Sequence, residues 1–129
     1  MSNTNLSAAL HDLLDHKVLL DTAIEQHFAP DYRQCTNGAW DDREGFVEHI
    51  AHLRTIVARA EISVLNELTD GDQYAERHVA RMVKVDGSTV TQEVFVFAQF
   101  APDGRFSSIE EVTNMLAGAE SDRGIGNAR

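Results

Sequence analysis

Apolar residues recur with one period in the first half of the chain and with another in the second half. In the first half, leucine, isoleucine and phenylalanine stand three and four positions apart, as they do on helices with one buried face. This spacing predicts helices over residues 5–14 and 18–28, and a third helix over residues 41–60. The first half of the chain is therefore expected to form helices that pack through one apolar face.

The second half, from about residue 61, alternates apolar and polar positions and is divided by three Asp-Gly pairs, at residues 70–71, 86–87 and 103–104. Asp-Gly between runs of strand-forming residues is a strong hairpin signal, so four antiparallel strands are predicted. Helices followed by a strand meander indicate an α+β fold, in which the helices pack on one face of a curved antiparallel sheet.

A short corner joins the two halves. Residues 31–36 predict an edge strand, Asn37-Gly38 predicts a turn, and Asp41-x-x-Glu44 has the capping-box pattern of a helix start. The broad rings of Tyr32 and Trp40 flank this corner and suit the lip of a pocket. Trp40 could equally seal the edge of the sheet. The corner is therefore expected to form part of the mouth of a small-molecule pocket.

Hairpin geometry divides the strands into two faces. A two-residue turn at Asp86-Gly87 would pair Val85 with Ser88, and a four-residue loop over 101–104 would pair Phe100 with Arg105. The face that is richer in β-branched residues is expected to face the helices. It consists of Arg77, Val79, Arg81, Val83, Val85, Gln92, Val94, Val96, Ala98, Phe100, Ile109, Glu111, Thr113 and Met115.

The opposite face carries an apolar patch of Phe95, Phe97 and Val112 between polar margins, which include Glu76 and His78. Exposed apolar patches on sheets mark partner surfaces, so this outer face predicts a homodimer. The last strand leaves one alternative open. A three-residue loop before it would turn Glu110 inward in place of Glu111. The complete outer face in this register consists of Tyr74, Glu76, His78, Ala80, Met82, Glu93, Phe95, Phe97, Gln99, Ser108, Glu110, Val112 and Asn114.

Composition narrows the possible partners and the setting. The 129 residues include 11 basic and 21 acidic side chains, a formal net charge of −10. Such a balance repels phosphate backbones and anionic membranes, so nucleic acid and membrane partners are not expected. A single cysteine and an N-terminus without a basic signal region indicate a cytoplasmic protein. We expect one domain over residues 1–117 and a polar tail over 118–129, either loose or a dimer strap.

The stretch DYRQCTNGAWDDREGFVEHI resembles the DYxQHNP…DGREGF stretch of SnoaL-like proteins, which are related to polyketide cyclases and belong to the NTF2-like superfamily. The resemblance covers roughly residues 5–116. It implies a cone-shaped α+β barrel that holds a ligand between helices and sheet, with an acid on a late strand as general base in cyclase and isomerase relatives. Glu111 looks equivalent to that acid. Cys35 stands where relatives often carry His, and Thr36-Asn37 replaces Asn-Pro.

Two interpretations fit Glu111. Burial on an apolar face would raise its pKa toward a value useful for acid–base work, or Arg77 or Arg81 would pair with it in a structural ion pair. Arg81 could also hold an anionic or carbonyl group of a ligand. His49, on the apolar stripe of the third helix, is either an acid–base group facing the pocket or a neutral core residue. No metal site and no organic cofactor are expected.

Three functions remain open. The first is a cofactor-independent cyclase-, isomerase- or dehydratase-like enzyme, in which Glu111 removes a proton next to a carbonyl of a small hydrophobic molecule. Arg81, Tyr32 or Gln34 would then stabilise the enolate. The second is a non-catalytic module that binds a small ligand, and the third is a dimeric scaffold. The residues expected to line the pocket are Tyr32, Gln34, Trp40, Gln92, Val94, Val96 and Thr113.

Overall fold

The computed structural model describes residues 3–128, in which three α-helices lie against one six-stranded sheet. The strands are ordered β2-β1-β6-β5-β4-β3, so β2 and β3 are the two edges and the sheet is not closed. The elements are α1 (Leu6–Leu14), α2 (Leu20–His27), β1 (Phe28–Thr36), β2 (Ala39–Asp42), α3 (Arg43–Ile56), β3 (Val57–Asp70), β4 (Gln73–Lys84), β5 (Thr89–Phe100), β6 (Phe106–Ala117), and two short 3-10 helices, η1 (Glu120–Asp122) and η2 (Ile125–Asn127).

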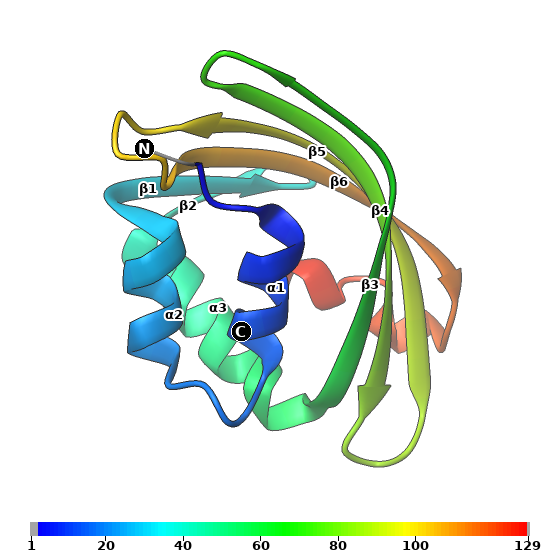
Figure 1. Ribbon diagram of the computed structural model, residues 1–129. Helices are drawn as coiled ribbons and strands as arrows, with labels where there is room; N and C mark the ends of the chain where they lie inside the picture. The colour runs from blue at the N-terminus through cyan, green and yellow to red at the C-terminus, as the bar shows by residue number, and fades with distance from the viewer. Residues whose placement is uncertain (1–2, 129) are drawn as a thin grey trace.

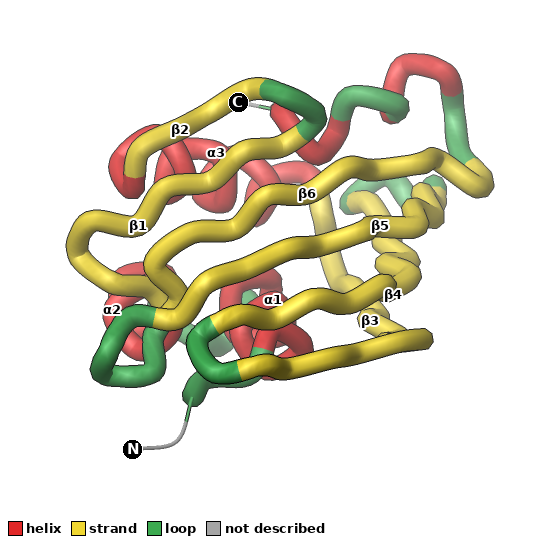
Figure 2. The backbone as a smooth tube through the Cα atoms, turned by 90° about the horizontal axis from the view of Figure 1, so that it is seen from above, coloured by secondary structure: helices red, strands yellow, loops and turns green. Residues whose placement is uncertain are grey.

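The sheet curves around the helices, which all lie on its concave side (Figure 1). Seen from above, the strands form one continuous layer whose β3–β4 end bends down beside the helices (Figure 2). Strand β1 runs parallel to β6, whereas the other neighbouring strands are antiparallel. This arrangement confirms the predicted α+β cone.

An aromatic cluster joins the helices to the sheet at one end of the cone. The ring of Phe28 lies 4.7 Å from that of Tyr32, 5.0 Å from that of Phe46 and 5.9 Å from that of Phe106, measured between centroids. These rings come from β1, α3 and β6, and each is at most 4% exposed. Each buried ring contributes roughly 3–5 kcal/mol, judged by the usual cost of truncation to alanine.

The corner differs from its prediction in two respects. Residues 28–36 are not an edge strand, because Asn37 and Gly38, with φ of 51° and 86°, turn the chain into a further strand, β2, which pairs with β1. The third helix starts at Arg43, and its N-cap is Asp42 and not Asp41, since the Asp42 side chain accepts a hydrogen bond from the Gly45 amide. It ends at Ile56, because Val57 already pairs with Lys84 in the sheet.

The predicted register of the β4–β5 hairpin is wrong by one residue. The Lys84 amide donates to the Ser88 carbonyl, so the loop has three residues, and Gly87 takes a positive φ of 88°. Asp86 stabilises this loop by accepting hydrogen bonds from the amide and the hydroxyl of Ser88. A one-residue shift turns every β4 side chain to the other face. Tyr74, Glu76, His78, Ala80 and Met82 therefore face the helices, while Arg77, Val79 and Arg81 face outward.

The inward face of β6 is as predicted, although its pairing differs. Val96 lies opposite Glu111 and not opposite Ile109, a shift of two residues that leaves the parity of the strand unchanged. Glu111 therefore points to the inner side of the sheet, and Glu110 is exposed on the outer side. The alternative register, with Glu110 inside, is wrong.

Residues 118–128 fold back onto the domain and are not a loose tail. Ile125 is only 6% exposed, and the side-chain amide of Asn127 donates to the Thr36 carbonyl over 2.9 Å. Lys84 forms an ion pair with Asp122 in the same segment. The end of the chain consequently forms part of the wall around the interior.

The guanidinium of Arg54 on α3 fixes the end of α1. Its Nε donates to the Leu13 carbonyl, Nη1 to the Val18 carbonyl and Nη2 to the Asp12 carbonyl, over 2.7, 2.7 and 3.0 Å. Asp12 and Leu13 carry carbonyls that the end of a helix leaves without intrahelical partners, and Val18 lies in the segment between α1 and α2. Within residues 3–128, no helix is long and apolar enough to cross a membrane.

Candidate functional site

A cavity of about 100 Å³ lies between the helices and the inner face of the sheet. Helices α1 and α3 cover it with apolar side chains, among them Leu10, Phe46 and Ile50, and Ile125 closes one side. Its volume equals that of roughly three liquid water molecules. The polar residues that line it are Gln34, His49, His78, Gln92, Glu111 and Thr113.

Glu111 on β6 is held by two neutral donors from β1. Its Oε1 accepts from the Gln34 amide over 3.1 Å and from the Thr36 hydroxyl over 3.0 Å. The parallel pairing of β1 with β6 brings these donors to Glu111, since Thr36 lies directly opposite it. Burial raises the pKa of Glu111, and the hydrogen bond from Thr36 offsets part of this effect.

Tyr32 acts on Glu111 indirectly, through Gln34. Its hydroxyl donates to the Gln34 carbonyl oxygen over 2.6 Å, which leaves the Gln34 amide nitrogen free to face Glu111. Burial, with the charge of Glu111 as a second cause, raises the pKa of Tyr32 well above its ordinary value. Tyr32 therefore stays protonated and orients Gln34, but it is not among the residues that line the cavity.

Glu76 and His78 on β4 are interior residues that the predicted register had placed outside. Their side chains are 1% and 4% exposed, and the His78 Nδ1 forms a short hydrogen bond with the Glu76 carboxylate. The pKa of Glu111 is lowered by the charge of His78 and raised by the charge of Glu76, so the three groups lie close enough to interact. Alternation along the strand grouped Tyr74, Glu76, His78, Ala80 and Met82 on one face, but it did not indicate which face points inward.

Two buried polar atoms in this region have no hydrogen-bond partner among residues 3–128: the side-chain amide nitrogen of Gln92 and the second carboxylate oxygen of Glu76. Gln92 is 3% exposed and lines the cavity. An unpaired buried donor costs roughly 1–3 kcal/mol, which is a cost that a ligand with a matching acceptor would remove. Gln92 therefore offers a hydrogen bond to whatever occupies the cavity.

His49 lines the cavity from α3, and its Nδ1 is hydrogen-bonded to the Ala128 carbonyl. Burial lowers its pKa from the ordinary 6.5. The folded protein therefore binds fewer protons than the unfolded chain just below pH 6.5, so His49 makes stability fall as the pH falls through its folded pKa.

We expect the His49→Gln variant to lose this acid sensitivity. Urea denaturation at pH 7.5 and at pH 5.5 gives the free energy of unfolding at each pH. Between these two pH values, wild type should lose more of this free energy than His49→Gln, by about 1.4 kcal/mol for each unit by which the pKa of His49 is lowered. His11 is exposed, so His11→Gln should behave as wild type does. Equal losses in wild type and His49→Gln would contradict the assignment.

Three predicted residues lie elsewhere. Arg81 is exposed on the outer face, opposite Thr91, because of the register shift of β4. Trp40 is 47% exposed on the edge strand β2, where the Arg33 guanidinium lies 4.3 Å from its ring centroid. Val96 is buried on the inner face but does not line the cavity, whereas Val94 does.

The structural ion pair proposed for Glu111 is wrong. Arg77 points outward and pairs with Glu93 over 3.2 Å, and it also donates to the Asn66 side chain. Arg81 is on the same outer face. Among the cavity-lining residues that the structure describes, no lysine or arginine is present, so the carboxylate of Glu111 depends on neutral donors and His78.

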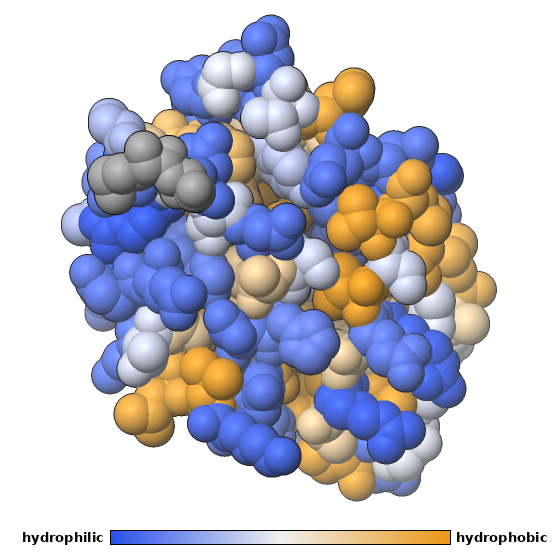
Figure 3. Space-filling model, in the orientation of Figure 1, coloured by the Kyte–Doolittle hydropathy of each residue, from blue (hydrophilic) through white to orange (hydrophobic). Residues whose placement is uncertain are grey.

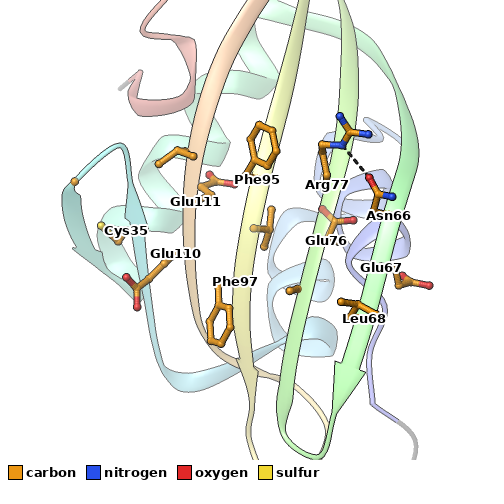
Figure 4. Close-up of a pocket in the computed structure, with 14 residues that line it drawn as sticks. Cys35, Asn66, Glu67, Leu68, Glu76, Arg77, Phe95, Phe97, Glu110 and Glu111 are labelled. Carbon is orange, nitrogen blue, oxygen red and sulfur yellow. Dashed lines mark hydrogen bonds between the residues drawn. The ribbon is translucent and has the colours of Figure 1, made fainter.

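The outer face of the sheet carries a separate open groove of about 690 Å³. Figure 4 shows Phe95 and Phe97 projecting into it from β5, with Leu68 and Arg77 on the neighbouring strands. Phe95, Phe97 and Val112 are 45%, 48% and 55% exposed. Apolar surface also gathers on the side of the molecule formed by β3 and β4 (Figure 3). The homodimer through Phe95, Phe97 and Val112 stays a prediction.

We expect Phe97→Glu to shift this dimer to monomers, because it would bury two like charges near the centre of an apolar contact. Sedimentation velocity at micromolar concentrations measures the change. Leu19 is 76% exposed at the start of α2, so Leu19→Glu is the matched control and should leave the dimer intact. A monomeric wild type would contradict the prediction.

The sequence matches no family model. It is 34% identical over 107 residues to the uncharacterised protein C11D3.04c of Schizosaccharomyces pombe, a match that covers 83% of this chain and 82% of the yeast protein. That relative gives the family but no activity.

Solved structures resemble the fold more widely. A proposed isomerase from Rhodopseudomonas palustris superimposes with a TM-score of 0.77 at 14% identity, covering 98% of this chain and 99% of that one. An NTF2-like protein from Exiguobacterium gives 0.67 at 18% identity, with 83% and 96% covered. A proposed SnoaL-like polyketide cyclase from Jannaschia gives 0.64 at 15% identity, with 88% and 91% covered. The chain therefore belongs to the family of the fission-yeast protein and has the NTF2-like fold found in SnoaL-like proteins.

Proposed function

We propose that this protein is a cofactor-independent acid–base enzyme that removes a proton next to the carbonyl group of a small molecule, with Glu111 as the base. One observation carries the proposal: the Glu111 carboxylate lies at the wall of a largely apolar cavity, held by the neutral donors Gln34 and Thr36. Burial raises its pKa, which makes the carboxylate a stronger base than one in water.

His78 is the best-placed partner for Glu111 and replaces Arg81 in the role expected from the sequence. The Glu76 carboxylate is hydrogen-bonded to its Nδ1, and the His78 ring lines the cavity beside Glu111. The His78 ring can donate a hydrogen bond to the carbonyl oxygen while Glu111 takes the proton from the adjacent carbon. Return of the proton from Glu111 to another carbon completes an isomerisation, so no redox partner is required.

The proposed activities of proteins with the same fold support acid–base chemistry of this class. Among the similar structures are a proposed isomerase and a proposed polyketide cyclase, although these similarities extend to the fold alone. The second candidate is a non-catalytic module that binds a small ligand in the same cavity. It is favoured by the small volume, about 100 Å³, which leaves little room for motion of a reacting molecule.

Exchange of α-hydrogens tests the proposal without knowledge of the natural substrate. Butanone in D₂O at neutral pH is incubated with the protein, and proton NMR follows the loss of the signals next to the carbonyl. We expect wild type to accelerate exchange and Glu111→Gln to return it to the buffer rate. Glu110 is the exposed neighbour on the outer face, so Glu110→Gln is the control that should match wild type.

The outcomes separate the candidates. Binding of butanone, seen as a raised melting temperature, without accelerated exchange would select the non-catalytic module. Exchange that persists in Glu111→Gln would show that Glu111 is not the base. Loss of exchange in both carboxylate variants would point to a general loss of structure, which circular dichroism detects.

A further inference from the structure

We propose that the cavity takes an uncharged carbonyl compound of about four to six non-hydrogen atoms, whose oxygen accepts from Gln92, and that Ile125 sets the upper limit on ligand size. This inference rests on the proposed site around Glu111 and adds to it the class of ligand. Three independent features carry it: the charge of the lining, the unpaired amide of Gln92, and the position of the C-terminal segment.

The charge of the lining excludes anions. Glu111 faces the cavity, Glu76 lies beside it through His78, and the described lining residues include no lysine or arginine. An anionic ligand would meet the carboxylates of Glu111 and Glu76 without a lysine or arginine in the described lining to balance them, in an interior where charge repulsion is strong. Carboxylates and phosphates are therefore rejected.

The unpaired amide of Gln92 excludes ammonium ions as well. Its Nε2 is buried, lines the same cavity and lacks an acceptor among residues 3–128. An ammonium group offers donors only and would leave this amide unpaired. A carbonyl oxygen provides the missing acceptor, and removing such an acceptor from a site built for it costs binding by tenfold or more.

The C-terminal segment limits the size of the ligand. Ile125 and Gly126 line the cavity, and Asn127 and Ala128 tie the segment to Thr36 and His49. The packing is close here, because a Cβ on Gly126 would lie 3.3 Å from the Thr36 methyl group. At the packing density of protein interiors, about 100 Å³ accommodates about four to six non-hydrogen atoms.

A pair of nearly isosteric probes tests charge and the role of Gln92. Dissociation constants of pyruvamide and pyruvate are measured by ligand-observed NMR at neutral pH, with wild type, Gln92→Met and Gln99→Met. We expect pyruvamide to bind at least tenfold more tightly than pyruvate, and Gln92→Met to weaken pyruvamide about tenfold. Gln99 is exposed on the outer face of β5, so Gln99→Met should match wild type.

A series of ketones tests the size limit. Wild type should bind butanone and exclude heptan-4-one, whereas Ile125→Ala, which removes three carbon atoms from the wall, should bind both. Ile125→Phe should exclude butanone, which keeps the test decisive even where Ile125→Ala loosens the segment. Val85 is 63% exposed, and Val85→Ala serves as the control.

Several results would overturn the inference: pyruvate that binds as well as pyruvamide, no binding of either probe, or an unchanged ketone preference in both Ile125 variants. These measurements report binding only. Selective binding without α-hydrogen exchange would therefore refute the proposed catalysis and leave the ligand class standing.

Discussion

Replacing Glu111 with glutamine is expected to slow α-hydrogen exchange by about 10²–10⁴-fold and, at neutral pH, to make the folded protein more stable. Glutamine keeps the shape and a carbonyl oxygen for the hydrogen bonds from Gln34 and Thr36, but it cannot accept the proton. It also removes a carboxylate at the cavity wall whose pKa is raised above the ordinary 4.5.

The gain in stability should depend on pH in a direction that linkage fixes. Because the folded pKa is raised, the folded protein binds more protons than the unfolded chain above pH 4.5, and wild type loses stability as the pH rises through the folded pKa. Glu111→Gln lacks this loss. Urea denaturation should therefore show no difference from wild type near pH 4 and an advantage at pH 7, about 1.4 kcal/mol for each unit by which the pKa is raised.

A variant that is destabilised at pH 7 would contradict this account, since it would mean that the charge of Glu111 is compensated in the folded state. Glu110→Gln is again the matched control, because Glu110 is exposed and its replacement should leave the free energy of unfolding within about 0.5 kcal/mol of wild type. Concurrent loss of exchange and gain of stability is the signature of a group retained for chemistry.

Arg54→Met is expected to lower the free energy of unfolding by about 2–4 kcal/mol. The variant loses three charge-assisted hydrogen bonds, to the carbonyls of Asp12 and Leu13 at the end of α1 and of Val18 in the segment that follows it. Methionine preserves much of the apolar stem, so the loss reports the guanidinium and not the packing of the side chain.

Urea denaturation at pH 7 measures this effect, with Arg59→Met as the control, because Arg59 is exposed on β3. Arg54→Lys should fall between wild type and Arg54→Met, since one ammonium cannot reach three carbonyls in the geometry of the planar guanidinium. A denaturation midpoint of Arg54→Met equal to that of wild type would refute the role of Arg54.

The sequence was sufficient for the fold and for the orientation of Glu111, but not for the full site. Apolar periodicity located the helices, and the Asp-Gly pairs located the hairpins, because both signals are local. The face of β4 depended on one residue of loop length at Asp86-Gly87, and no local signal distinguished a two-residue turn from the three-residue loop that Ser88 stabilises. Because of this one-residue difference in loop length, the predicted register placed Glu76 and His78 on the outer face and Arg81 on the inner face.

The hydrogen bonds to Glu111 could not be predicted from the local sequence pattern either. Gln34 and Thr36 reach it through the parallel contact of β1 with β6, and these residues are separated by about 75 positions in the sequence. The inward turn of residues 125–128 was missed for a similar reason. Polar and glycine residues surround Ile125, so the local composition favoured a loose tail.

The parallel contact between β1 and β6 also constrains how the chain matures. During synthesis, β1 emerges early and gains β2 at once, but its other edge waits until most of the chain has left the ribosome. Closing a loop of this length is entropically costly and slow, so we expect the carboxylate and its donors to meet late in folding. Nascent chains that stall before β6 keep an unpaired edge of β1, and we expect this edge to favour self-association.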